Sequence, residues 1–237
     1  MESELLYKAK KTLHKQASVT KAKILQSFFK TGKGQYGEGD IFIGVTVPQV
    51  REIAKQFSDL KQDDILKLLH SKIHEERLLA LFIWIIQYQK GNEKIRAMIV
   101  ADYIKNTRYI NNWDLVDLSA PKIIGDFLSD KKHDILYSMA KSSLLWDRRI
   151  AVVATYAFIR EQRFEDTFKL TEKLLKDKED LMHKACGWML RECGKRNENE
   201  LKRFLQKYYR DMPRTMLRYA IERFDEKTRK NYITGTV

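Results

Sequence analysis

The sequence predicts an all-α protein built as a solenoid, in which pairs of helices stack along the chain. Apolar residues recur at helical spacing along most of the 237 residues, for example at Ile65, Leu68 and Leu69. The apolar-polar alternation typical of strands is nearly absent. A short pattern also repeats about every 35 residues, as expected for stacked helical repeats. Together these observations define the fold class.

Each expected helix follows from a stripe of apolar residues bounded by polar or glycine residues. We expect helices over residues 3–16, 19–30, 47–57, 61–71, 74–90, 93–106, 113–127, 130–142, 146–162, 164–176, 180–195, 197–210 and 213–223. Chain length and a hydrophobic content of 43% are compatible with a single domain over residues 1–237.

The repeat consists of segments in which a basic residue precedes a small or apolar run. If Arg77, Arg149, Lys184 and Arg218 are equivalent, their separations are 72, 35 and 34 residues, and the segment at Trp113 falls in the first gap. One unit is therefore about two helices and two turns, as in HEAT-like solenoids. Corresponding helices of such a solenoid line the same side, so we expect the basic residues to share one concave surface.

The charge balance favours a polyanionic partner. The formal net charge is +13, and Lys and Arg outnumber Asp and Glu by 19 to 14 over residues 1–118 and by 26 to 18 over residues 119–237. The excess is spread along the chain and is not a basic tail. The expected phosphate contacts are Arg77, Arg148, Arg149, Lys184, Arg191, Lys195 and Arg218. The alternative is that these residues are merely solvated helix faces.

The cysteine spacing and the N-terminal sequence bear on the redox state and the cellular compartment of the protein. Cys186 and Cys193 are seven residues apart in one expected helix, too far for a disulfide, so we expect reduced thiols. The acidic N-terminus lacks the apolar stretch of a signal peptide, and no segment has the apolar length of a membrane span. We expect a cytoplasmic monomer that does not bind membranes.

One long interruption, residues 31–40, contains four glycines, which disfavour helix. A phosphate-cradling nucleotide loop is one interpretation. However, the spacing from Gly32 to Gly39 matches neither a Walker A loop nor the dinucleotide fingerprint, and no strand precedes it. We therefore expect a connecting or DNA-facing loop and no nucleotide cofactor.

The residues that favour chemistry are aromatic and acidic. The histidines occur singly, without the spacing of a catalytic triad or a metal site, so no metal is expected. Trp84 is interpreted as core and Trp146 as a packing residue before a helix. Trp113 and Asp117 are four residues apart in one expected helix and would share a face. Asp114, near the helix start, is interpreted as a cap and dipole residue.

Three motifs in order resemble those of the AlkD-like DNA alkylation repair glycosylases, over nearly the whole chain. Residues 113–117, Trp-Asp-Leu-Val-Asp, are similar to the family's Trp-Asp-x-Val-Asp. Residues 146–149, Trp-Asp-Arg-Arg, are similar to its Trp-x-x-Arg. Residues 184–192, Lys-Ala-Cys-Gly-Trp-Met-Leu-Arg-Glu, are similar to its Lys-Ala-x-Gly-Trp-x-Leu-Arg-Glu.

The resemblance implies cleavage of the N-glycosidic bond of cationic alkylated purines in double-stranded DNA. The catalytic aspartate of the family matches Asp117, its two lesion-contacting aromatic residues match Trp113 and Trp188, and its arginine near the lesioned strand matches Arg149. The chain departs from the family near Phe28 and Phe29, where an aromatic hydroxyl can occur, and the loop after them is longer than in the best-known branch.

Two other function classes stay open at this point. The first is a non-catalytic HEAT-like module that binds nucleic acid or protein through the same surface, with Trp113 and Trp188 as anchors. A carboxylate such as Asp117 on a cationic DNA-facing surface argues against it, because it repels phosphate. The second is a peripheral membrane protein attracted by charge, which lacks support because no basic amphipathic terminal helix is present.

Overall fold

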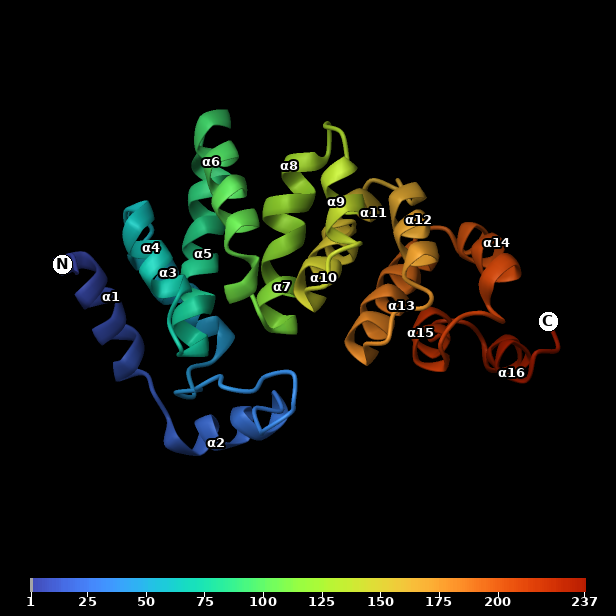
Figure 1. Ribbon diagram of the computed structural model, residues 1–237, viewed down its shortest axis with the longest axis horizontal. Coiled ribbons are helices and arrows are strands. Elements are labelled where there is room, and N and C mark those ends of the chain that lie inside the picture. Colours follow the sequence, from blue (N-terminus) through green and yellow to red (C-terminus); the bar gives the residue numbers. More distant parts are fainter. Residues whose placement is uncertain (1) are drawn as a thin grey trace. The chain divides into compact units, whose positions relative to one another are not determined.

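The computed structural model describes residues 2–237 and is helical almost throughout (Figure 1). Within these residues, extended pairing is limited to one isolated bridge between Ile41 and Ile73. Helices pack mainly against helices close to them in sequence, as in a helical-repeat solenoid. The predicted all-α solenoid class is confirmed. The chain forms two compact units, one up to Leu115 and one from Val116 on, and this division falls inside helix α7 (Trp113–Ala120).

The first unit is organised around helix α5. Its elements are α1 (Glu4–Lys15), α2 (Val19–Phe28), α3 (Val47–Gln56), α4 (Gln62–Leu69), α5 (His74–Lys90), α6 (Glu93–Lys105) and the 3₁₀ turn η1 (Thr107–Tyr109). Helix α5 is buried on all sides over its first three turns and packs against α3, α4 and α6. Trp84, in this helix, is fully buried as predicted, and its indole N–H donates to Gln62 Oε1 at 3.0 Å.

The segment between α2 and α3 is held by a buried carboxylate. Glu75 accepts hydrogen bonds from the backbone N–H groups of Ile43, Gly44 and Val45 at 2.8–3.2 Å. Gly44 has a φ of 85°, and a Cβ atom there would lie 2.2 Å from the carbonyl oxygen of Ser18. Only glycine allows this close passage past the start of α2. Helix α2 itself has no buried residue, and it is held by the hydrogen bonds of Gln26 with the backbone of Asp40 and Phe42 and by the ring contact of Phe28 with Trp113.

The second unit is organised around helix α13. Its elements after α7 are η2 (Pro121–Gly125), α8 (Asp126–Leu128), α9 (Asp134–Met139), α10 (Leu145–Ala154), α11 (Tyr156–Arg160), α12 (Glu165–Lys173), α13 (Asp180–Gly194), α14 (Glu198–Tyr208), α15 (Arg214–Ala220) and α16 (Glu226–Thr234). Helix α13 packs against α10, α14 and most extensively α15. Its buried thiols, Cys186 and Cys193, are free, as predicted.

Two expected helices are interrupted. The helix predicted over 113–127 changes at Pro121 into the π-helical turn η2, because proline has no N–H to donate to the carbonyl four residues earlier. The helix predicted over 146–162 divides at Thr155, whose hydroxyl donates to the carbonyl of Val152 at 2.6 Å and competes with the regular ladder.

One observed helix lies outside every predicted range, and one predicted helix is longer than the observed one. Helix α16 begins after Asp225, whose carboxylate accepts from the N–H of Thr228, and ends at Gly235 in the left-handed conformation. The helix predicted over 130–142 is only α9, six residues long. No helix within residues 2–237 combines the length and apolar character needed to cross a membrane.

Candidate functional site

Helix α7 carries Trp113 and Asp114, which belong to the first unit, and Asp117, which belongs to the second. In the first unit, Trp113 is half-buried and its backbone N–H donates to Asn112 Oδ1 at 2.8 Å. Phe29 stacks on the indole with a centroid distance of 5.0 Å and an interplanar angle of 21°, and Phe28 meets it edge-on at 5.9 Å. The indole Nε1–H donates to the Tyr36 hydroxyl at 3.1 Å.

Asp114 has contacts beyond the predicted cap and dipole role. It lies in the first turn of α7, as expected for a dipole role, but it is 6% exposed and its Oδ2 is 2.9 Å from His74 Nε2. The other ring nitrogen of His74 lies 3.2 Å from Asp40 Oδ2, and Arg77 donates to Asp40 Oδ1 at 2.7 Å. Asn112 donates to Asp40 as well, at 3.2 Å. These residues, Asp40, His74, Arg77, Asn112 and Asp114, form the buried polar network of the first unit.

Protonation of this network follows from its geometry. Both ring nitrogens of His74 face carboxylate oxygens, so the doubly protonated imidazolium satisfies both contacts. Burial lowers the pKa of His74, but the charge and hydrogen bond of Asp114 and the hydrogen bond of Asp40 outweigh it, and the net pKa is raised. Burial raises the pKa of Asp40, but His74 and Arg77 outweigh it, and the net pKa is lowered.

In the second unit, Asp117 is paired with Arg149. The guanidinium Nε donates to Oδ1 at 2.9 Å and Nη2 donates to Oδ2 at 2.8 Å, a bidentate arrangement that fixes the plane of the carboxylate. The Arg149 Nη1 donates to the carbonyl of Leu181 at 2.6 Å. Arg149 is 4% exposed, whereas the side chain of Asp117 retains 16% of its exposure. The carboxylate is thus oriented from the protein side and still reachable from solvent.

Trp188 lies on α13 and is half-buried. The ring of Tyr156 is 6.2 Å from it with a tilt of 30°, and Arg196 lies over the Tyr156 ring at 5.6 Å. The preceding residue of the motif, Gly187, faces α15, and a Cβ atom there would lie 2.5 Å from the carbonyl oxygen of Met216. This glycine is required for the close packing of α13 on α15, which also fixes the position of the tryptophan.

The expected phosphate contacts fall into three groups. We expected Arg77 and Arg149 on an exposed basic surface, but both are buried. Arg77 is 3% exposed and bonded to Asp40, and Arg149 is paired with Asp117. Arg77 neutralises the buried carboxylate of Asp40, and Arg149 neutralises the partly exposed carboxylate of Asp117. Arg148 is bonded to Asp177 with 14% of its side chain exposed.

The remaining expected contacts are more accessible. Lys184 is 39% exposed and pairs with Asp180, while Lys195 is 38% exposed and pairs with Glu192. Arg191, 18% exposed, pairs with Glu222. Arg218 is exposed on α15. These four stay predictions as DNA contacts.

Sequence reasoning did not find Tyr36, His74 or Asp40. They belong to the loop 31–40 and to the start of α5, more than 30 residues from Trp113 and Asp114 in sequence. For Tyr36 the sequence offers one weak indication of a role, namely that it is an aromatic residue in a glycine-rich loop. Nothing local distinguished His74 from the other histidines.

The fold and these residues define a helical-repeat protein with an oriented acidic residue on helix α7. Residues 9–224 match the family described as "DNA alkylation repair enzyme", and the chain belongs to that family, as its three motifs predicted. Its structure is similar to that of a predicted DNA alkylation repair enzyme from Enterococcus faecalis, with a TM-score of 0.68 and 15% identity over 89% of this chain and 98% of the other. At this identity the likeness concerns the fold alone. No curated protein matches the chain.

Proposed function

We propose that this protein is a DNA glycosylase that hydrolyses the N-glycosidic bond of cationic alkylated purines, such as 3-methyladenine and 7-methylguanine, in duplex DNA and leaves an abasic site for base excision repair. The observation that carries the proposal is the solvent-reachable carboxylate of Asp117 on helix α7, which Arg149 of helix α10 holds in a bidentate pair. Membership of a DNA alkylation repair family supports DNA as the substrate class.

The chemistry needs stabilisation of a cation. An N3- or N7-alkylated purine is positively charged and leaves with the electron pair of the glycosidic bond as a neutral base. The deoxyribose left behind is an oxocarbenium ion, and an aspartate, ionised at neutral pH, stabilises it electrostatically. Water adds to the anomeric carbon, Asp117 accepts the hydrogen bond that orients it, and the proton that the added water loses passes to bulk solvent. Trp113 and Trp188 offer π faces to the sugar cation.

Arg149 has a positioning role in this mechanism. A lone carboxylate repels approaching phosphates, and the guanidinium compensates that charge before DNA binds. Its two parallel hydrogen bonds also keep the carboxylate in one orientation, so no reorganisation is needed as the sugar becomes positive. The compensation is partial, because the Asp117 side chain keeps 16% of its exposure to solvent beside the guanidinium. Arg149 is therefore expected to affect orientation as well as stability.

The test is release of methylated purines from alkylated duplex DNA under single-turnover conditions. Asp117→Asn is expected to lower the rate a hundredfold or more, because a preorganised charge of this kind contributes about 3 to 4 kcal/mol. Asp134→Asn, an exposed acid in the first turn of α9, is the matched control and should retain the wild-type rate. An unchanged rate for Asp117→Asn would refute the assignment of the catalytic residue. DNA binding by a wild type that releases neither base would instead favour the non-catalytic binding module.

A further inference from the structure

Trp113 is the outer member of a group of four packed aromatic rings in the first unit. Phe29 lies against the indole at 5.0 Å, Phe42 stacks on Phe29 at 4.8 Å and 15°, and His74 stacks on Phe42 at 4.3 Å and 23°. Phe29, Phe42 and His74 are 6%, 5% and 1% exposed. We call these four rings the Trp113 cluster. The stack is not linear, because Phe29 also lies 5.3 Å from His74 at a tilt of 34°. Phe29, Phe42 and His74 therefore form a compact buried group behind the half-buried indole.

Both ends of the cluster are held by hydrogen bonds. At the inner end, His74 bridges Asp40 and Asp114. At the outer end, Tyr36 accepts from the indole Nε1, and Asn112 connects the backbone of Trp113 back to Asp40. Asp40 therefore contributes to both ends.

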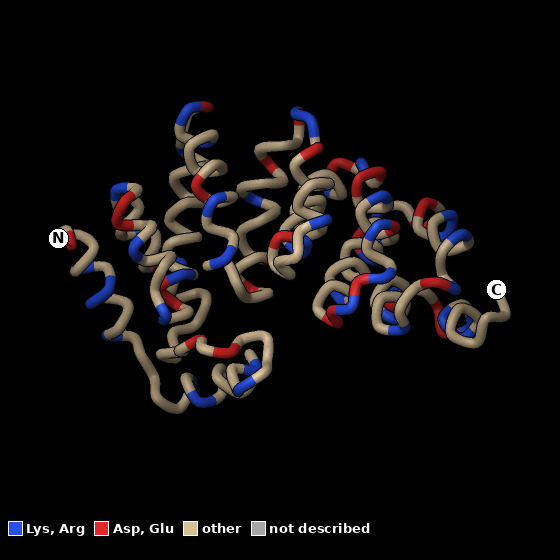
Figure 2. Tube along the Cα trace, in the orientation of Figure 1, with Lys and Arg blue, Asp and Glu red and all other residues tan. Residues whose placement is uncertain are grey.

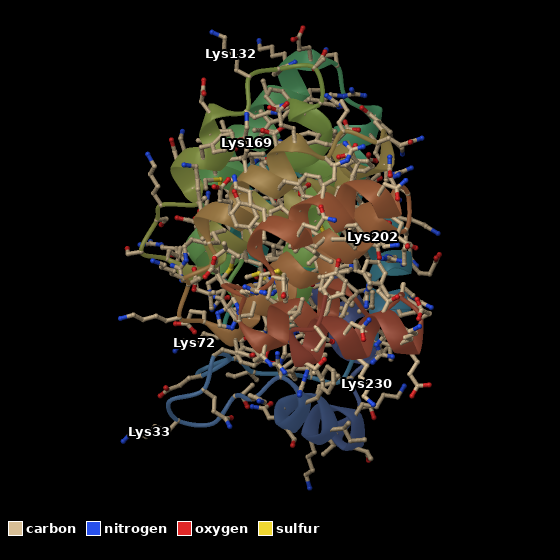
Figure 3. All side chains as sticks on the ribbon, turned by 90° about the vertical axis from the view of Figure 1, so that its right-hand side faces the viewer. Lys33, Lys72, Lys132, Lys169, Lys202 and Lys230 are labelled. Carbon is tan, nitrogen blue, oxygen red and sulfur yellow. The ribbon has the colours of Figure 1, made fainter. Side chains whose placement is uncertain are left out.

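The glycine-rich loop explains how Tyr36 reaches the indole. Gly34 and Gly39 have φ values of 75° and 87°, and a Cβ atom at Gly37 would lie 2.5 Å from the carbonyl oxygen of Phe29. These conformations fold the loop back on the end of α2. Lys33 instead projects away from the helices (Figure 3).

We propose that Tyr36, Phe29, Phe42 and His74 are positioning residues that hold the Trp113 indole in one orientation for the proposed glycosylase reaction, and that loop 31–40 serves to bring Tyr36 to it. The inference rests on the proposed function only for its effect on rate. The orientation itself is a property of the free protein. A half-buried indole held by stacking alone rotates more freely than one also fixed through its Nε1–H, and small displacements of a group that contacts the reacting sugar lower the rate.

The first experiment follows the indole directly and needs no activity. In ¹H–¹⁵N spectra of the full chain, Trp113→Phe identifies the Trp113 indole N–H signal. Tyr36→Phe removes only the hydroxyl, so the Trp113 signal should shift and its exchange with solvent should become faster. Tyr7→Phe, at a 57% exposed tyrosine of α1, is the matched control. An unchanged Trp113 signal in Tyr36→Phe overturns the proposal, whatever the protein catalyses.

The second experiment measures rate and affinity separately. Tyr36→Phe is expected to lower single-turnover excision about three- to tenfold, the value of one hydrogen bond, with DNA affinity unchanged. An equal loss in affinity and none in rate would mean that Tyr36 only binds DNA, and would overturn the positioning role. If wild type releases no base while Tyr36→Phe still changes the indole signal, the proposed function fails and the positioning of Trp113 stands.

The inner end of the cluster is tested through pH. The charged groups facing His74 are Asp40, Asp114 and Arg77, and Glu75 and Lys21 line the cavity of about 390 Å³ beside it. As His74 loses its proton at high pH, the bridge between the carboxylates weakens, so the Trp113 signal should titrate. His74→Gln should abolish this titration, whereas His70→Gln, at an exposed histidine, should retain it. A Trp113 signal independent of pH across the titration of His74 overturns the role of His74, and Tyr36→Phe tests the cluster should His74→Gln not fold.

Discussion

At the scale of single residues, each unit contains a carboxylate that is paired with a buried arginine. Asp40 in the first unit is 5% exposed and bonded to Arg77, and Asp117 in the second is bonded to Arg149. Removing one member of such a pair costs more than the pair contributes, because the remaining charge stays buried without compensation. The two arginines therefore stabilise the folded protein, and this role does not depend on any contact with DNA.

Replacement of Arg149 by methionine is expected to lower the free energy of unfolding by about 2 to 4 kcal/mol, below the usual loss for a fully buried pair because Asp117 keeps some exposure. Arg149→Lys retains the charge but not the bidentate geometry and should lose less stability. Urea denaturation measures both, with Arg160→Met at an exposed arginine of α11 as control. A loss under about 1 kcal/mol for Arg149→Met would show that the pair is solvated and does not orient Asp117.

Stability should also depend on the protonation of His74. Its folded pKa is raised above the unfolded value of about 6.5, so its contribution is complete below pH 6.5 and is lost as pH rises through the folded pKa. Asp40 has a lowered pKa, so its contribution is present above about pH 3.9 and is lost as pH falls through its folded pKa. The difference in unfolding free energy between wild type and His74→Gln, measured in urea, should therefore be largest near pH 6 and shrink as pH increases. A difference that grows with pH contradicts the imidazolium bridge.

At the scale of secondary-structure elements, the features that could be predicted are mainly helix positions, which follow from the local spacing of apolar residues. Ten of the thirteen predicted helices lie close to their observed bounds, since amphipathic spacing is visible within a few turns. The break at Pro121 was visible in the sequence but was overlooked, whereas the contacts of Asp114 with His74 were not visible at all. Such contacts join residues distant in sequence, and a single histidine carries no local sign of the two carboxylates around it.

Helix α13 offers a matched pair of glycines. Gly187→Ala places a Cβ atom 2.5 Å from the backbone of Met216, which forces α13 away from α15, and we expect a loss of about 1 to 3 kcal/mol despite better helix propensity. In Gly194→Ala the new atom lies 2.4 Å from the terminal Cδ2 of the buried Leu201 side chain, which can shift more readily than backbone, so the loss of stability should be smaller than for Gly187→Ala. Thermal denaturation of both variants provides the comparison. Equal melting temperatures would contradict the close approach of α13 and α15.

At the scale of the whole molecule, charge is distributed and largely compensated locally. Lys and Arg occur along the trace of both units, with Asp and Glu between them (Figure 2). The net charge of +13 therefore arises from exposed side chains throughout the chain and not from one basic segment. Several lysines, including Lys132 and Lys169, project outward from the ribbon (Figure 3). A polyanion is attracted by this field as a whole, whereas its register depends on individual contacts.

The salt dependence of DNA affinity separates phosphate contacts from structural cations. Each Lys or Arg that neutralises a phosphate contributes about −0.9 to the slope of log K against log salt concentration. Lys184→Ala and Arg218→Ala are each expected to make the slope less negative by about that amount and to retain wild-type stability, because both side chains reach solvent. Arg77→Met should leave the slope unchanged and lower stability, since its guanidinium is bonded to Asp40 in the interior. Fluorescence anisotropy on an undamaged duplex at several salt concentrations measures the slopes without any excision. A slope altered by Arg77→Met in a protein that remains folded would mean that Arg77 leaves its buried network to contact DNA.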